Sequence, residues 1–324
     1  MKVVSEKLTC KRCGSSNIVG YGHYHNIPRF WCKDCRHKFA ANNALPKYKT
    51  PIEQVTHALA SFYNGNSLND IKNELESQYG TKITEAAVYY WVRQQSDKAV
   101  TATNQLKPNV GDIWIADETS VPVGTGKRNY WLIDIIDRDT RFLLATRLSR
   151  TRTAHDIELT MLKAKERAGK SPKTVLSDGW LGYIDGIERA FGSDTKHIQS
   201  NPFTDKNSTV YIERVQGSLK DRTKVFRALK KKDTAQVILD GWVAYYNFFR
   251  PHLSLNERTP AEAAGIKYLF KNWGEFVRYQ MPQPPQPERL EARLTNINDI
   301  PSFIRQQGIP KNVKRALGMT MPKF

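Results

Sequence analysis

The sequence predicts a mixed α/β domain that follows two smaller N-terminal modules. Three observations predict it: four cysteines are confined to the first 35 residues, residues 50 to 100 have helical periodicity, and alternating and continuous apolar runs begin near residue 111. At 324 residues the chain is longer than one ordinary domain needs. We therefore expect four parts, at residues 1–45, 46–105, 106–266 and 267–324.

The first part contains a metal-binding pattern of cysteines. Cys10 and Cys13 form one pair, Cys32 and Cys35 form a second, and eighteen residues separate the pairs. This is the spacing of a zinc ribbon, in which two knuckles bring four sulfurs to one tetrahedral site. So short a module needs the metal because its own core is too small. We expect one structural Zn²⁺, and four free or redox thiols are the alternative.

The second part is predicted to contain three helices arranged as a helix-turn-helix. Ser67 and Asp70 form a capping-box-like start for the second helix, and Thr84 caps the third. The last helix could enter a major groove and present Arg93 to DNA, although similar helical hairpins occur in domains that bind nothing. The first two expected helices span Pro51–Tyr63 and Leu68–Gln78.

The third part is predicted to be a sheet of five strands. Three meandering strands are followed by a helix capped by Thr153, then by a strand, a helix, a strand and a long helix, which is a ribonuclease H-like order. In that layout the first and fourth strands are neighbours. The expected strands are Gly111–Asp117, Tyr130–Ile136, Arg141–Leu148, Lys173–Ser177 and a short one near His197–Gln199.

The strand order predicts a site made of carboxylates. Asp117 and Asp178 both lie near strand ends, and Glu213 begins the basic face of the long helix, opposite an apolar stripe. Three such acids suit two Mg²⁺ or Mn²⁺ ions, which are hard cations that prefer oxygen ligands. Strand alternation places Glu118 on the other face from Asp117, so we expect it outside the site, with Asp134 as a supporting group. Unrelated surface acids are the alternative.

These residues resemble the DDE transposases of prokaryotic insertion sequences, which are related to retroviral integrases. The resemblance covers Asp112–Ile266 and rests on local motifs and spacing: Ala-Asp-Glu-Thr at Asp117, Ser-Asp-Gly at Asp178, Glu213 after thirty-four intervening residues, Lys220 seven residues beyond it, and the stretch from Tyr246 through His252 to Glu262. It implies that Asp117, Asp178 and Glu213 bind two catalytic metal ions. It also implies that Lys220 approaches DNA.

The resemblance implies a DNA transposase that binds the ends of a mobile element and carries out metal-dependent strand cleavage and strand transfer. It also implies a homodimer or higher oligomer on DNA. A net charge of +18 fits a nucleic-acid partner, and Lys224 and Arg227 share the basic face of Lys220. A domesticated, catalytically silent zinc-ribbon/helix-turn-helix DNA-binding protein is the alternative.

The remaining expectations concern location and the end of the chain. No apolar run approaches the roughly 18 residues that span a membrane, and the N-terminus has no long apolar segment typical of a secretory signal. We therefore expect no membrane partner and a cytoplasmic, nucleoid-associated protein. Residues 267–324 contain a possible helix at Tyr268–Tyr279 and the proline-rich linker Pro282–Pro287. No function is assigned to them.

Overall fold

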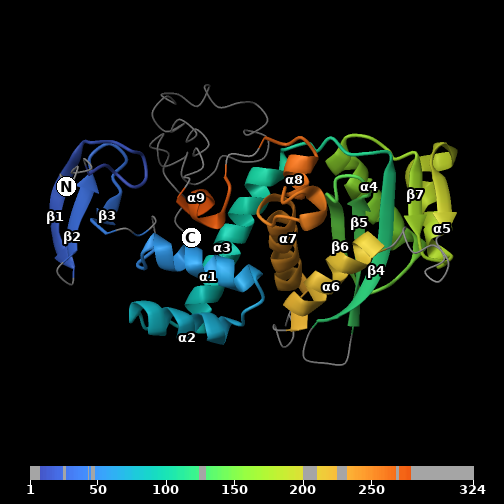
Figure 1. Cartoon of the computed structure of the whole chain (residues 1–324). Coiled ribbons are helices and arrows are strands. Elements are labelled where there is room, and N and C mark those ends of the chain that lie inside the picture. Colours follow the sequence, from blue (N-terminus) through green and yellow to red (C-terminus); the bar gives the residue numbers. More distant parts are fainter. Residues whose placement is uncertain are drawn as a thin grey trace, which may run out of the picture. The chain divides into compact units, whose positions relative to one another are not determined.

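The structure is a computed structural model. It describes residues 8–24, 27–42, 44, 48–123, 129–199, 210–224, 232–267 and 270–278 (Figure 1). The predicted DNA contact Arg227 and the proline-rich linker lie outside these residues. Within the described part, no helix combines the length and the apolar character that crossing a membrane requires.

A small antiparallel sheet forms the N-terminal module. Its strands are β1 (Ile18–Tyr24), β2 (Ile27–Cys32) and β3 (Lys38–Ala40), in that order. Its core contains the buried side chains of Cys10, Cys32 and Phe39, and the rings of Phe30 and Phe39 stack at 5.9 Å. So few buried side chains leave the module dependent on another source of stability.

Three helices follow, as the sequence predicts: α1 (Ile52–Tyr63), α2 (Leu68–Tyr79) and α3 (Glu85–Asn104). Ser67 and Asp70 form the expected capping box, and Gly80 ends α2 in the left-handed region with φ 64°. The Thr84 hydroxyl accepts a hydrogen bond from the Ala87 backbone N–H. Local caps therefore set both ends of α2 and the start of α3.

The mixed sheet also has the predicted strands. They are β4 (Ile113–Pro122), β5 (Asn129–Asp137), β6 (Leu143–Ser149), β7 (Thr174–Ser177) and β8 (Lys196–Gln199). The order across the sheet is β6-β5-β4-β7-β8, with β4 antiparallel to β5 and parallel to β7. This confirms the ribonuclease H-like mixed α/β fold.

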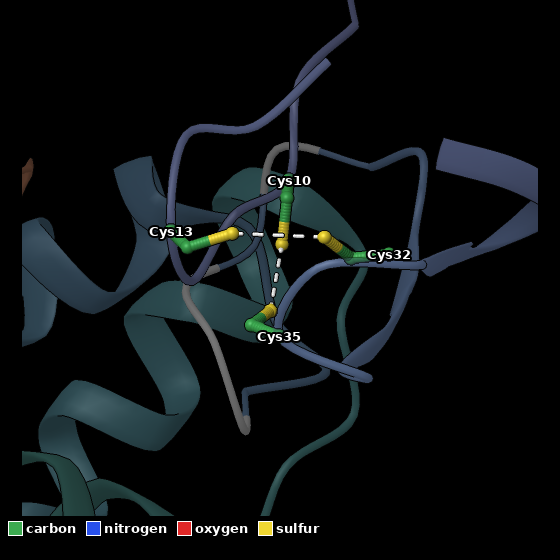
Figure 2. Close-up of side chains that lie close together, drawn as sticks. All are labelled: Cys10, Cys13, Cys32 and Cys35. Atoms are coloured by element: carbon green, nitrogen blue, oxygen red, sulfur yellow. Dashed lines mark hydrogen bonds between the residues drawn. The ribbon is translucent and has the colours of Figure 1, made fainter. Parts of the chain in front are cut away.

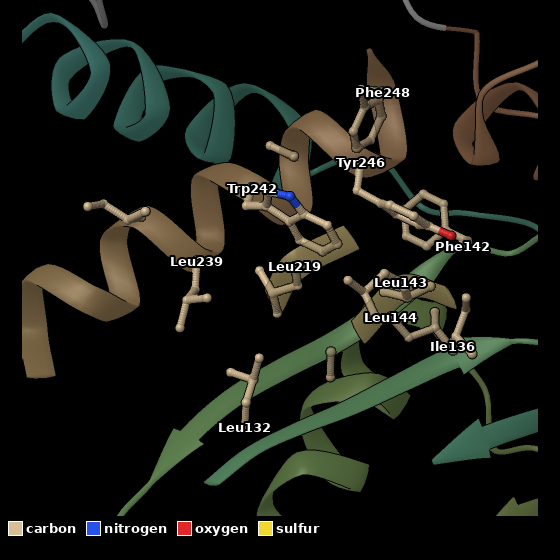
Figure 3. Close-up of a cluster of buried hydrophobic side chains, with 14 of the residues drawn as sticks. Leu132, Ile136, Phe142, Leu143, Leu144, Leu219, Leu239, Trp242, Tyr246 and Phe248 are labelled. Carbon is tan, nitrogen blue, oxygen red and sulfur yellow. The ribbon is translucent and has the colours of Figure 1, made fainter. Parts of the chain in front are cut away.

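Helices cover the sheet. They are α4 (Ala154–Ala168), α5 (Gly182–Phe191), α6 (Val210–Lys224) and α7 (Lys232–Phe248), followed by the short α8 (Pro260–Ala263) and α9 (Trp273–Arg278). α4 packs on β5 and β6, α7 on β6, and α6 on β4 and β5. Figure 3 shows Trp242 of α7 and Leu219 of α6 facing Leu132 of the sheet. Because Leu132 and Ile133 are both fully buried, both faces of β5 are covered.

The stretch from Tyr246 to His252 joins α7 to the sheet. The Asn247 side chain accepts a hydrogen bond from the Leu143 backbone N–H at 2.9 Å and donates one to the Leu143 carbonyl at 3.0 Å. Both groups are buried, so this amide satisfies main-chain groups of β6 that would otherwise lack partners. The predicted helix at Tyr268–Tyr279 is shorter in the structure, where α9 spans Trp273–Arg278.

The helical module and the sheet share one hydrophobic core. The cluster of buried side chains that includes Phe62 and Val92 continues into the sheet residues, and α3 packs against α7. A Cβ atom added at Gly241 of α7 would lie 2.6 Å from the Ser96 Cβ and 2.6 Å from the Tyr63 hydroxyl. Gly241 therefore permits the close approach of α3 to α7.

Candidate active site

Two acids meet where β4 and β7 run side by side. These strands pair in parallel with Ile115 opposite Leu176, so Asp117 and Asp178, two residues further along, come level with each other. One ligand atom from each of Asp117, Glu118 and Asp178 lies within 4.8 Å of the other two. The structure thus brings together two acids of the predicted triad. Their catalytic role stays a prediction.

The expectation that Glu118 cannot share a site with Asp117 is wrong. The ladder to β5 continues past Asp117 and Glu118, but the pairing between β4 and β7 ends at Leu176, so on the β7 side no ladder separates the two faces of the sheet at these residues. Both side chains can then reach toward Asp178, although their Cβ atoms start on opposite faces. Strand alternation fixes the direction of a Cβ atom but not the position of a longer side chain's carboxylate.

Glu118 has partners that the other acids lack. Its side chain is only 2% exposed, and it accepts a hydrogen bond from Arg152 Nη1 at 2.6 Å and another from the Tyr183 hydroxyl. The Arg152 guanidinium in turn lies 4.8 Å from the Trp131 ring centroid and 4.4 Å from that of Trp180. Glu118 is therefore held in an ion pair with Arg152 and by the Tyr183 hydroxyl. Sequence reasoning missed Arg152 and Tyr183 because only the fold brings them to β4.

The site is electrostatically unfavourable without a cation. Burial, followed by repulsion from Glu118, raises the pKa of Asp117 to about 7, and the negative charges of Asp178 and Asp134 add to the effect. Burial also raises the pKa of Glu118, against the opposing effect of its Tyr183 and Arg152 partners. Clustered carboxylates of this kind offer the hard oxygen ligands that Mg²⁺ and Mn²⁺ prefer. The donor set therefore fits a divalent cation.

Two neighbouring contacts shape the site further. The Trp180 backbone N–H donates to Asp178 Oδ1 at 3.0 Å, which orients that carboxylate. Asp134, the register partner of Asp117 on β5, is fully buried and accepts a hydrogen bond from the Thr146 hydroxyl at 2.8 Å. Its Oδ2 atom has no hydrogen-bond partner among the described residues, and burial raises its pKa to about 7.

Glu213 and the predicted DNA contacts stand apart from this cluster. Glu213 lies on an exposed position of α6, the helix that packs against β4, but it is outside the group of acids whose ligand atoms lie within 4.8 Å. Lys220 is also exposed on α6, and Arg93 is exposed on α3. Lys224 ends α6, and its side chain lies outside the described part of the structure. The roles of these residues stay predictions.

The four cysteines gather at one point of the N-terminal module, as Figure 2 shows. Their sulfur atoms all lie within 4.8 Å of one another; the Cys10–Cys35 separation is 3.5 Å and the Cys13–Cys32 separation is 3.6 Å. The Cys35 backbone N–H leads the effects that lower the pKa of Cys32 to about 7, whereas burial raises the pKa of Cys35 to about 12. Four sulfurs at this spacing fit a tetrahedral zinc ion.

One segment of the chain matches a known protein family. Residues 204–260 match the family described as "Integrase core domain". No curated protein sequence matches the chain.

Among solved structures, the HTLV-2 integrase catalytic core domain in complex with magnesium is similar at 17% identity, covering 49% of this chain and 98% of that one, with a TM-score of 0.38. The BIV integrase catalytic core domain is similar at 16% identity, covering 48% and 93%, with a TM-score of 0.37. A simian T-cell lymphotropic virus intasome is similar at 14% identity, covering 71% and 77%, with a TM-score of 0.37. These structural likenesses are weak, and the strand order β6-β5-β4-β7-β8 is the stronger sign of the fold. The match to the integrase core family over residues 204–260, together with that sheet, agrees with the resemblance found in the sequence.

Proposed function

We propose that this chain is a DNA transposase that binds the ends of a mobile element and catalyses metal-dependent cleavage and transfer of DNA strands. The observation that carries the proposal is the cluster of Asp117, Glu118 and Asp178 at the junction of β4 and β7. In an integrase-like core, such a cluster points to phosphodiester chemistry rather than to a purely structural role.

The metal ligands follow from the geometry and from the resemblance together. Asp117 and Asp178 would hold the divalent ions, with Glu213 as the proposed third ligand from α6. Two such ions would supply an activated nucleophile and charge stabilisation for an in-line displacement at phosphorus. Glu118, already paired with Arg152, is proposed to position the site rather than to bind metal.

The protein's own residues contribute orientation and charge. The Trp180 backbone N–H holds one oxygen of Asp178. Asp117 must lose its proton before it can act as an anionic ligand, because burial and its acidic neighbours raise its pKa to about 7. The three N-terminal helices and the ribbon are proposed to bind the element ends, with Arg93, Lys220, Lys224 and Arg227 as candidate phosphate contacts.

Nicking of DNA that carries the cognate ends tests the proposal. We expect nicking that requires Mg²⁺ or Mn²⁺, and we expect Asp178→Asn to abolish it while DNA binding is retained. Asp185→Asn is the matched control, because Asp185 is an exposed acid on α5 outside the cluster. A wild-type protein that binds the ends but never nicks them would favour the silent DNA-binding alternative.

A second pair of variants decides which glutamate completes the site. If Glu213 is the third ligand, Glu213→Gln should abolish nicking as completely as Asp178→Asn does. Glu118→Gln should retain measurable nicking, because the glutamine oxygen can still accept from Arg152 while its amide N–H₂ donates to the Tyr183 hydroxyl, which can also act as an acceptor. The reverse result would assign the third ligand to Glu118.

A further inference from the structure

A cavity lies beside α6, outside the acid cluster. It has a volume of about 440 Å³ and is bounded by α6, the end of α7, and the segment that follows α7. Three arginines line it: Arg141 from the turn before β6, Arg214 from α6 and Arg250 from the segment that follows α7. Its described lining includes no carboxylate. Three positive charges thus face one space with no neutralising group in its wall.

Arg141 is held in a costly arrangement at this cavity. Its backbone lies in the left-handed region at φ 60°, which is unfavourable for residues other than glycine and asparagine. Its guanidinium carbon lies 3.2 Å from the Tyr211 ring centroid. Its Nε and Nη1 atoms are buried, with no hydrogen-bond partner among the described residues. Because these two atoms are also shielded from the cavity, Arg141 contributes to the cavity through its positive charge rather than through these donors.

His252 also lies within the field of the positive charges of Arg250 and Arg141. Its ring is 4.7 Å from the Tyr246 ring centroid, and it donates a hydrogen bond to the Tyr246 backbone carbonyl. Burial, followed by the positive charges of Arg250 and Arg141, lowers its pKa to about 4. Its Nε2 atom is buried, also without a partner among the described residues. The neutral ring therefore forms a wall of a cavity whose potential is positive.

Helix geometry separates this cavity from the proposed catalytic face. Successive residues of an α-helix turn by about 100°, so Tyr211 and Arg214 lie on one flank of the buried stripe of α6. Glu213 and Lys220 lie on the other flank. A ligand in the cavity would therefore contact the same helix as the catalytic centre without occupying that centre.

We propose that this arginine cavity binds a phosphate of the DNA backbone, at a position away from the phosphodiester that reacts. Guanidinium groups suit phosphate oxygens because they offer several donors in a fixed planar geometry. The volume lies within the range of about 300–1,000 Å³ typical of ligand sites, so the adjoining sugar also fits. The proposal rests on the proposed function only for the choice of DNA as the source of the phosphate.

Two variants and one matched control test the proposal with the full-length, zinc-loaded chain in the absence of Mg²⁺. Arg250→Gln removes one guanidinium. Arg141→Asn removes another and places a residue that tolerates φ 60° in the turn. Arg189→Gln removes the same charge from an exposed position of α5 outside the cavity. Thermal unfolding of each variant verifies that it folds.

The first measurement is the affinity for a labelled DNA duplex over a series of salt concentrations. We expect each cavity variant to weaken binding by about tenfold and to lower the slope of log K against log salt by about one, as loss of a phosphate contact does. Arg189→Gln should change both values less. Equal affinities and slopes for Arg250→Gln and Arg189→Gln would overturn the proposal.

The second measurement uses inorganic phosphate as the probe. We expect phosphate to raise the melting temperature of the wild type more than chloride of equal ionic strength does, and we expect this gain to be lost in Arg250→Gln. An equal gain in both proteins would overturn the site. DNA would be ruled out as the occupant if phosphate raised the melting temperature of the wild type alone while Arg250→Gln left the affinity for the duplex unchanged. Because neither measurement involves nicking, a failure of the proposed catalytic function would be seen separately.

Discussion

Substitution of Asp134 by asparagine should change how stability depends on pH. In the wild type, burial raises the pKa of Asp134 from 3.8 to about 7. The folded-state pKa lies above the unfolded value, so its contribution to stability is fully present below pH 3.8 and is lost as the pH rises through about 7. One pKa unit corresponds to about 1.4 kcal/mol, so the loss should amount to about 4 kcal/mol.

Asparagine removes this titration while keeping the shape of the side chain. Its Oδ1 atom can still accept the Thr146 hydrogen bond, which is 2.8 Å long in the wild type. Its amide N–H₂ takes the place of Oδ2, an atom without a partner among the described residues, at a cost of about 1–3 kcal/mol that does not vary with pH. At pH 4, Asp134→Asn should therefore be less stable than the wild type or equally stable. As the pH rises, its free energy of unfolding should increase relative to that of the wild type.

Urea unfolding between pH 4 and pH 8, without divalent cations, measures the effect. The difference in the free energy of unfolding between Asp134→Asn and the wild type should increase by about 4 kcal/mol across this interval. Gly217→Ala is the control, because it removes no titratable group and its added Cβ meets nothing within 4 Å, and its difference should stay nearly constant. A difference for Asp134→Asn that does not vary with pH would refute the reasoning.

Three further predictions concern the scaffold. Zinc removal, or Cys32→Ser, should abolish amide exchange protection in β1–β3 while the mixed sheet keeps its protection; unchanged protection in β1–β3 would contradict a structural metal. Gly241→Ala should lower the free energy of unfolding by about 1–3 kcal/mol through overpacking, whereas Gly217→Ala, where a Cβ meets nothing within 4 Å, should raise it by up to about 1 kcal/mol. Asn247→Ala should cost about 2 kcal/mol or more in urea unfolding, because it leaves the Leu143 N–H and carbonyl without partners; a smaller cost would show that water replaces the amide.

The elements of the fold were predictable because local signals define them. The capping residue Thr84 marks the true start of α3, and Thr153 forms a capping box with Asp156 at the start of α4. The apolar runs gave four strands that lie within two residues of the observed ones. The first strand was predicted to end at Asp117, but β4 continues to Pro122, so Asp117 lies in mid-strand rather than near a strand end. The alignment of Asp117 with Asp178 could also be predicted, because the ribonuclease H-like order makes β4 and β7 parallel neighbours.

The residues that surround the acids could not be predicted from the sequence. Arg152 precedes α4 and Tyr183 lies within α5, and no local pattern links either to Glu118, which they bind across the fold. The rule of alternating side chains gave the wrong result for Glu118 because it describes the Cβ direction and not the reach of a carboxylate. The cavity lined by Arg141 and Arg250 likewise joins residues that are more than a hundred positions apart.

The contact at Gly241 limits how this protein can be re-engineered. Under the proposed function, exchange of the N-terminal helices for those of a relative would be one way to redirect the protein to new DNA sequences. A cut between α3 and β4, however, would pass through the stacked rings of Tyr63 and Trp273, 5.1 Å apart, and would leave Gly241 facing an unmatched surface. A chimera should therefore carry α7 and α9 together with the transplanted helices, or exchange only the ribbon that precedes them.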